Sequence, residues 1–129
     1  APAVNVEFRR AENEPSPGLT KVMLPCMHNP IYVSPTAELT NADIAEAAVG
    51  QTERGDVAID IAFTDDGAEK MFKLTSTHLM KPLAILIDDK VIAAPRIVSA
   101  IRKKAQITCN FSKAEAERIA GGILSRSAQ

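Results

Sequence analysis

The longest uninterrupted apolar run in this sequence has strand length, and this limits the folds open to the chain. It covers residues 83–87, with the sequence Leu-Ala-Ile-Leu-Ile. A helix that spans a bilayer needs about 20 predominantly apolar residues, so no membrane span is predicted within these 129 residues. A short run that is apolar at every position is typical of a β-strand buried on both faces.

Other strands are predicted from the alternation of apolar core residues with polar residues or alanine. Residues 57–63 and 105–111 alternate throughout, and residues 4–9 alternate around Val6 and Phe8. This period of two is that of a strand with one face in the core. Two shorter strands are predicted at 21–24 and 31–34. The prolines and glycine of residues 11–18 indicate a loop, and residues 25–30 indicate a turn.

Three helices are predicted from capping residues followed by apolar stripes. Thr40 and Asp43 form a capping pair that predicts a short helix ending by Gly50. Thr64 and Asp65 precede a second helix, and Ser112 with Glu115 opens a third. The stripe of the second helix is expected to comprise Ala68, Met71, Phe72, Thr75 and Leu79. Phe72 is therefore expected to face the core, where its truncation to alanine would cost about 3–5 kcal/mol.

The order of these elements predicts an α+β domain. We expect an antiparallel or mixed β-sheet with two to three helices packed on one face, ferredoxin-like in character. Residues 1–29 are interpreted as an N-terminal strand and hairpin arm, and residues 30–129 as the main domain. The expected core is Val57, Ile59, Ile61, Phe63, Met71, Phe72, Ile85, Ile87, Ile107, Phe111, Ile119 and Ile123.

Charge and cysteine content exclude some functions and leave one question open. The chain has 15 Lys and Arg against 16 Asp and Glu, a formal net charge of −1. Proteins that bind nucleic acid need clustered excess positive charge, so no nucleic-acid partner is predicted. Cys26 and Cys109 form no CxxC pair. We expect a buried, inert Cys109 and an accessible Cys26, and a disulfide between them is the alternative.

The residues that carry catalysis or bind metals in other proteins have structural explanations here. The pairs at 65–66 and 88–89 are aspartates, and they stand where a helix start and a tight turn favour acids. His28 and His78 have no ligand at metal-binding spacing. The glycines at 121–122 follow no strand, unlike those of a phosphate loop. No enzymatic activity, metal or cofactor is predicted.

Four segments in order resemble one known family, the periplasmic head region of the SecD and SecDF protein-export subunits. They are residues 39–44 (Leu-Thr-Asn-Ala-Asp-Ile), the Phe-Thr to Leu-Thr segment at 63–75, the strand, turn and Ala-Ala-Pro of 83–97, and 105–111 before an alanine-rich helix. The likeness covers about residues 30–125. The glycine usual after the turn aspartate is Asp89 here.

The resemblance implies a non-catalytic, extracytoplasmic protein-binding domain associated with protein export or envelope maintenance. Its partner would be an unfolded or partner polypeptide. The expected location is periplasmic or otherwise extracytoplasmic, and an anchor would lie outside this chain in the full-length protein. The residues expected to contact protein are those of the turn and of the segment after it: Asp88, Asp89, Lys90, Ala93, Ala94 and Pro95. The hairpin around 25–30 is a further candidate.

A second function class remains open at this point. A fold does not fix a function, so a stand-alone envelope domain that binds a small ligand is the alternative. An exposed apolar groove or a free sheet edge would favour protein binding. A closed concave pocket with converging polar groups would favour a small ligand.

Overall fold

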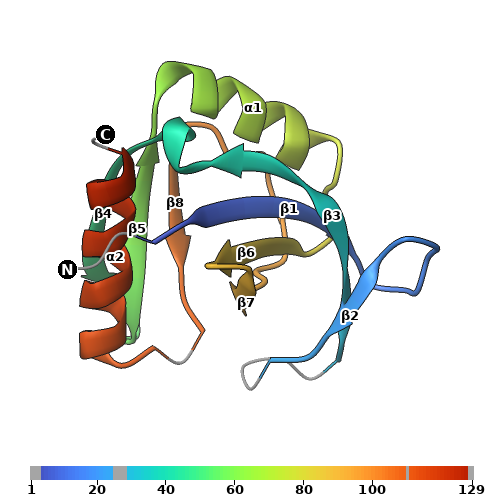
Figure 1. The fold of residues 1–129 in the computed structure, drawn as a ribbon, viewed down its shortest axis with the longest axis horizontal. Helices are drawn as coiled ribbons and strands as arrows, with labels where there is room; N and C mark the ends of the chain where they lie inside the picture. The colour runs from blue at the N-terminus through green and yellow to red at the C-terminus, as the bar shows by residue number, and fades with distance from the viewer. Residues whose placement is uncertain (1–3, 25–28, 110, 128–129) are drawn as a thin grey trace.

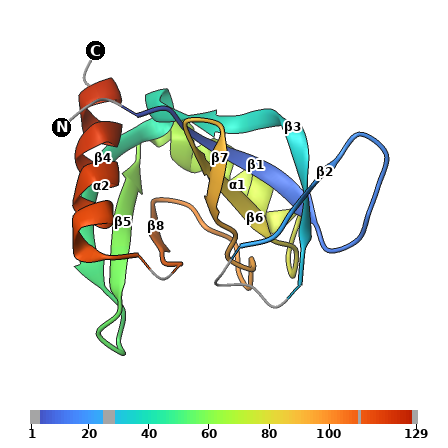
Figure 2. The same ribbon diagram turned by 60° about the horizontal axis from the view of Figure 1, so that its bottom comes forward.

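The computed structural model describes residues 4–24, 29–109 and 111–127, and for 124–127 the backbone alone. The elements in chain order are β1 (Val6–Glu12), β2 (Thr20–Val22), β3 (Ile31–Thr40), the 3-10 turn η1 (Asn41–Asp43), β4 (Ile44–Gln51), β5 (Val57–Phe63), α1 (Asp65–Ser76), β6 (Leu83–Ile87), β7 (Lys90–Ala93), β8 (Lys104–Ile107) and α2 (Lys113–Ser127). Figures 1 and 2 show their arrangement. The predicted α+β class is confirmed.

The described strands form two antiparallel sheets. The five-stranded sheet has the order β2-β3-β1-β6-β7, and the three-stranded sheet has the order β4-β5-β8. β6 is buried at all five positions and lies between β1 and β7, which confirms the prediction made from its apolar run. β1 pairs with both β3 and β6, so the first strand of the chain is the middle strand of its sheet.

The predicted helix over residues 40–50 is wrong, because this segment turns once and then becomes β4. The carboxylate of Asp43 does accept a hydrogen bond from the Thr40 amide at 3.0 Å. The chain then becomes extended at Ile44 and pairs with β5 as far as Gln51. An irregularity in register between Ile44 and Glu46 interrupts the alternation. Pairing along a whole strand outweighs the helix propensity of an alanine-rich segment.

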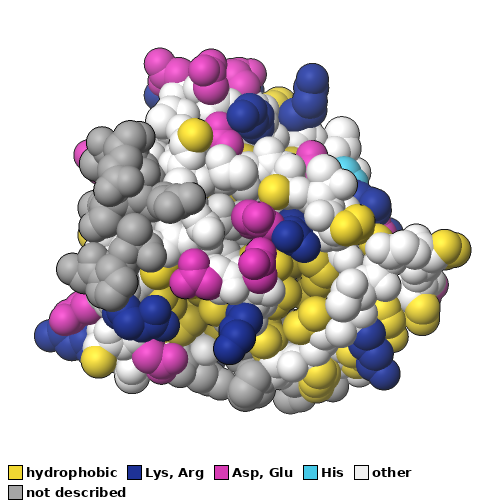
Figure 3. Space-filling model, in the orientation of Figure 1, with side chains coloured by type: hydrophobic (Ala, Val, Ile, Leu, Met, Phe, Trp, Pro, Cys, Tyr) yellow, Lys and Arg dark blue, Asp and Glu magenta, His cyan; other side chains and the backbone are white. Residues whose placement is uncertain are grey.

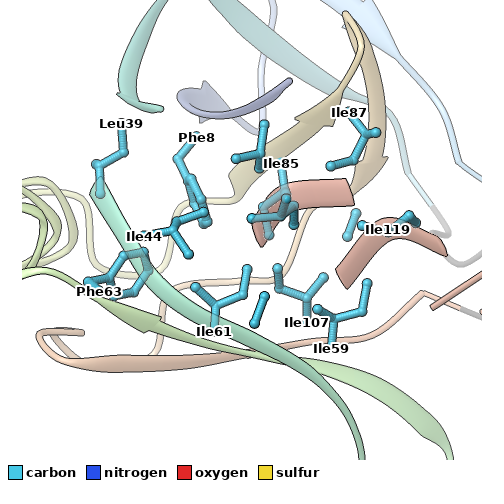
Figure 4. Packing of buried hydrophobic residues seen from close by; sticks show 14 of the residues in the cluster. Phe8, Leu39, Ile44, Ile59, Ile61, Phe63, Ile85, Ile87, Ile107 and Ile119 are labelled. Atoms are coloured by element: carbon cyan, nitrogen blue, oxygen red, sulfur yellow. The ribbon is translucent and has the colours of Figure 1, made fainter. Parts of the chain in front are cut away.

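The main core lies between the two sheets and against α2 (Figure 4). Most of the predicted core residues are buried there, including Ile59, Ile61 and Ile85. The core also contains Phe8, which is fully buried and whose ring meets that of Phe63 edge-on, with centroids 5.6 Å apart. The burial of Phe8 makes β1 an integral part of this core.

The phase predicted for the second helix is wrong at one position. α1 buries Ala68, Met71, Leu74 and Thr75, whereas Phe72 is 38% exposed. The Arg102 guanidinium lies 4.1 Å from the centre of the Phe72 ring. At about 100° per residue, Phe72 falls just outside the arc that is centred on Met71. The stripe also ends early, because Leu79 lies beyond the helix and is exposed.

Contacts between residues 39–44 and 63–75, two of the segments that carry the family resemblance, hold the turn η1 against the start of α1. The Asp43 carbonyl accepts a hydrogen bond from the Thr64 amide at 2.9 Å, and the Thr64 hydroxyl caps α1 at Gly67 N. The Asp43 carboxylate pairs with Lys70 at 3.0 Å. Buried Asn41 accepts from Val6 N at 2.7 Å. These residues therefore have structural roles.

The final helix begins as predicted. Ser112 N donates to Glu115 Oε1, and Glu115 N donates to Ser112 Oγ, which completes the capping box.

The cysteine prediction is wrong. Cys109 is disulfide-bonded rather than a free thiol, and it is half-buried. Cys26, the other cysteine of the sequence, lies outside the described residues. A membrane-spanning helix is not found in the described part of the chain.

Candidate protein-contact surface

The turn between β6 and β7 presents three charged residues to solvent. Asp88 and Asp89 have φ angles of 49° and 69°, and Ile87 pairs with Lys90 across them. Two consecutive positive φ angles are typical of a two-residue type I′ hairpin. Asp88 is fixed in place, because its carboxylate accepts from Asn5 N and its amide donates to Asn5 O, both at 2.9 Å.

The other predicted contact residues are less accessible. Ala93 is 0% exposed, so its side chain belongs to the core. Ala94 and Pro95 are half-buried, and the Pro95 carbonyl accepts a hydrogen bond from Leu83 N at 2.9 Å. The hairpin therefore exposes Asp88, Asp89 and Lys90, while the following segment offers only parts of two side chains. Of the second candidate hairpin, residues 25–28 lie outside the described part.

Asp89→Gly is expected to stabilise the domain by about 0.5–1 kcal/mol. A residue with a β-carbon is strained at a φ of 69°, whereas glycine adopts this conformation freely, and Asp-Gly is a preferred pair in this turn. Urea unfolding measures the change. Asp88→Gly is the contrasting variant, because it also removes the bond to Asn5 N and so should gain less or destabilise. Equal gains in both variants would contradict this explanation.

A second apolar cluster, which was not predicted, is formed by side chains of β1, β3 and β6 and is bordered by β7. It comprises Ala11, Ile31, Val33, Ala84 and Leu86, with Val22, Val91 and Ala94 half-buried at its border. Figure 3 shows hydrophobic side chains gathered over β6 and β7, with charged side chains along their upper border. The all-apolar sequence of β6 indicated burial on both faces, but not which strands would share the second face.

The end of β1 carries a charge cluster near this surface. Glu12 forms ion pairs with Lys81 at 2.5 Å and with Arg10 at 2.9 Å. The hydrogen bond from Lys81 is the main cause that holds the pKa of Glu12 below its ordinary value. Arg10 acts in the same direction, and partial burial opposes both.

Glu12→Gln is expected to make stability less dependent on pH. The folded state lowers the pKa of Glu12 from its ordinary value of 4.5, so the stabilisation is present above that value and is lost as the pH falls below it and through the folded pKa. The loss should not exceed about 1 kcal/mol, because Lys81 is substantially exposed. Urea unfolding at pH 7 and pH 3.5 measures it. Exposed Glu14→Gln is the control, and identical behaviour of the two variants would contradict the assignment.

The other residues considered as possible catalytic or metal-binding groups have structural roles. Asp65 and Asp66 occupy the first turn of α1. His78 follows the end of α1, and its Nδ1 lies 2.7 Å from the Leu74 carbonyl oxygen. Among the described residues, no three His, Cys, Asp or Glu side chains are grouped as a metal site.

Comparisons with known proteins agree on one family. The model of the family "SecDF, P1 head subdomain" matches residues 20–126. The protein translocase subunit SecD of Aquifex aeolicus is 39% identical over 82 residues, which cover 64% of this chain and 16% of that protein. SecD of Acidaminococcus fermentans is 37% identical over 90 residues, covering 69% and 21%. The chain thus spans about a fifth of the length of these relatives.

Solved structures show the same fold. A structure of SecDF, described as a membrane component that enhances protein export, superposes with a TM-score of 0.75 at 26% identity, over 96% of this chain and 63% of that one. SecDF in a super-membrane-facing form gives a TM-score of 0.74 at 26% identity, over 95% and 19%. Together with the match over residues 20–126, these likenesses confirm the resemblance: the chain belongs to the SecDF P1 head subdomain family.

Proposed function

We propose that this domain is a non-catalytic, extracytoplasmic module that binds extended polypeptide in protein export. The observation that carries the proposal is the position of β7, which ends the five-stranded sheet and borders an apolar cluster. An unpaired strand edge offers backbone donors and acceptors to any extended chain, with little demand on sequence. Family membership supports the proposed connection with export.

The side chains around β7 suit this role. Val91 and Ala94 are half-buried beside the apolar cluster, so a chain paired with β7 would cover apolar surface as well as backbone groups. The charged turn at Asp88, Asp89 and Lys90 sits at one end of the strand. Contacts of this kind are shallow, and we expect weak, reversible binding to many sequences.

Titration of the isotopically labelled domain with a permanently unfolded polypeptide tests the proposal. Amide shifts are expected in Lys90–Ala93 and at Ala94. Val91→Lys places a charge at this edge and should weaken binding at least about fivefold, since edge charges block pairing. Val98→Lys is the matched control, because Val98 is 73% exposed in a loop, and it should bind normally.

Two outcomes would overturn the proposal. Absence of binding at millimolar polypeptide would remove it and leave the small-ligand alternative. Equal weakening by Val91→Lys and Val98→Lys would show that β7 is not the contact. Thermal unfolding of both variants establishes that each remains folded.

A further inference from the structure

A further edge strand, β8, which ends the three-stranded sheet, has an apolar cleft beside it. β8 pairs with β5, and no other described strand pairs with it. A cavity of about 250 Å³ adjoins this strand, and its lining includes Leu83, Ile85, Ile97 and Ile107. We refer to it as the β8 cleft. Its apolar floor belongs to the main core, and these four side chains are buried.

The segment that connects β7 to β8 forms a fixed wall of this cleft. Thr75 Oγ1, which is fully buried, accepts a hydrogen bond from Ile101 N at 2.7 Å. Ile97 N donates to Lys81 O at 2.9 Å. The wall is therefore tied to α1 and to the start of β6 at two points, and a preformed cleft costs little ordering entropy on binding.

The two faces of β8 differ in character. Ala105 and Ile107 pack towards the core, whereas Lys104 and Gln106 are exposed on the outer face. Gln106 Nε2 donates to Asp60 Oδ1 on the neighbouring strand at 2.9 Å. A shallower hollow of about 490 Å³ lies on this outer face, and Lys104 and Gln106 line it as well. The free edge of β8 therefore has one hollow on the core side of the sheet and another on the outer side.

A strand added to β8 would place its side chains alternately in these two surroundings. Neighbouring strands lie about 4.8 Å apart, and successive side chains point to opposite faces. Residues opposite Ala105 and Ile107 would enter the apolar cleft. Residues opposite Lys104 and Gln106 would lie on the outer face, where Asp60 is one strand farther away.

Three exposed cations lie near this edge, whereas the acidic side chains that line the outer hollow, Glu46 and Asp60, belong to the other two strands of the sheet. Arg96, Lys103 and Lys104 are exposed, and none of them takes part in the ion pairs found among the described residues. Arg96 and Lys104 both line the β8 cleft. Opposite charges directly across two strands stabilise their pairing, so an acidic residue is the complement of Lys104.

We propose that β8 binds an extended polypeptide segment in which apolar residues alternate with polar ones and an acidic residue faces Lys104. The apolar side chains occupy the β8 cleft. This inference rests on the proposed function and names the class of segment that the domain binds and a second edge at which it binds.

The test uses two fluorescent eight-residue peptides that alternate valine with polar residues and differ only in carrying glutamate or lysine at the polar positions. Fluorescence anisotropy should show about fivefold tighter binding of the glutamate peptide, and amide shifts should appear in Lys104–Ile107. Lys104→Glu should reverse the preference. Lys21→Glu on β2 makes the same change in net charge at a distant exposed site and should leave the preference intact.

The outcomes separate this inference from the proposed function. Shifts confined to β7, or a preference that Lys104→Glu and Lys21→Glu alter equally, would overturn the β8 site while polypeptide binding stands. Failure of both peptides and of unfolded polypeptide to bind would overturn both proposals. Binding of dodecanoate in the cleft without any peptide binding would identify a pocket for amphiphiles and contradict the inference.

Discussion

Phe8→Ala is expected to lower the free energy of unfolding by about 3–5 kcal/mol. Phe8 is 0% exposed, and it stands on β1 where the five-stranded sheet faces the three-stranded sheet. Its removal would leave a cavity beside Phe63, whose ring it meets edge-on. The surrounding backbone belongs to two sheets, so it can collapse only partly into the space. Urea unfolding followed by circular dichroism measures the loss.

Phe72→Ala is the matched control, because it makes the same chemical change at the surface. Phe72 is 38% exposed and contacts Arg102, and an exposed contact of this kind contributes about 0.5–1 kcal/mol. The loss should therefore stay near or below about 1 kcal/mol. A larger loss for Phe72→Ala than for Phe8→Ala would contradict the core described here.

Gly67→Ala is expected to destabilise the domain by about 2–3 kcal/mol. A β-carbon at Gly67 would lie 2.3 Å from the Asp43 carbonyl oxygen, which already accepts the Thr64 amide. The backbone of η1 or of α1 must shift to relieve this clash. In an ordinary helix the same substitution stabilises by about 1 kcal/mol, so the sign of the effect is diagnostic.

Thermal and urea unfolding of Gly67→Ala check this prediction, with Lys73→Ala as the control. Lys73 is exposed on α1, and its substitution should change stability by less than about 0.5 kcal/mol. A stabilising Gly67→Ala would mean that η1 and α1 do not approach as closely as the structure shows.

The strands with clear alternation or a fully apolar run could be predicted from the sequence. β5 and β6 follow directly from residues 57–63 and 83–87, because their patterns record burial on one face or on both. β4 could not be predicted, since the register irregularity after Ile44 hides its period and alanine favours a helix. Its partner β5 decides the structure, and that pairing is not local.

The exposure of Phe72 and the disulfide at Cys109 could not be predicted from the sequence for the same reason. A helical stripe is about 120° wide, so a residue at its border is placed by the tertiary structure rather than by spacing. A disulfide depends on a distance between segments far apart in the chain. Both depend on contacts that no local pattern contains.

The candidate contact surface could be predicted only in part. The turn at Asp88 and Asp89 follows from local chemistry and is present in the structure, while its contact with protein stays a prediction. Ala93 and the β8 cleft depend on which strands become neighbours: Ala93 faces the core because β7 pairs with β6, and the cleft exists because β8 pairs on one side. Sheet edges are a property of topology, and topology was not determined by the pattern of the elements.

Site-specific photo-crosslinking to unfolded polypeptide tests most directly whether the domain binds extended chains at its sheet edges. A photoreactive residue would replace Lys90 beside β7, Gln106 on β8 or, as a control, Glu117 on the exposed side of α2. We predict crosslinks from positions 90 and 106 that unlabelled polypeptide competes away, and none from position 117. Equal yields at all three positions, or none at 90 and 106, would contradict binding at the sheet edges.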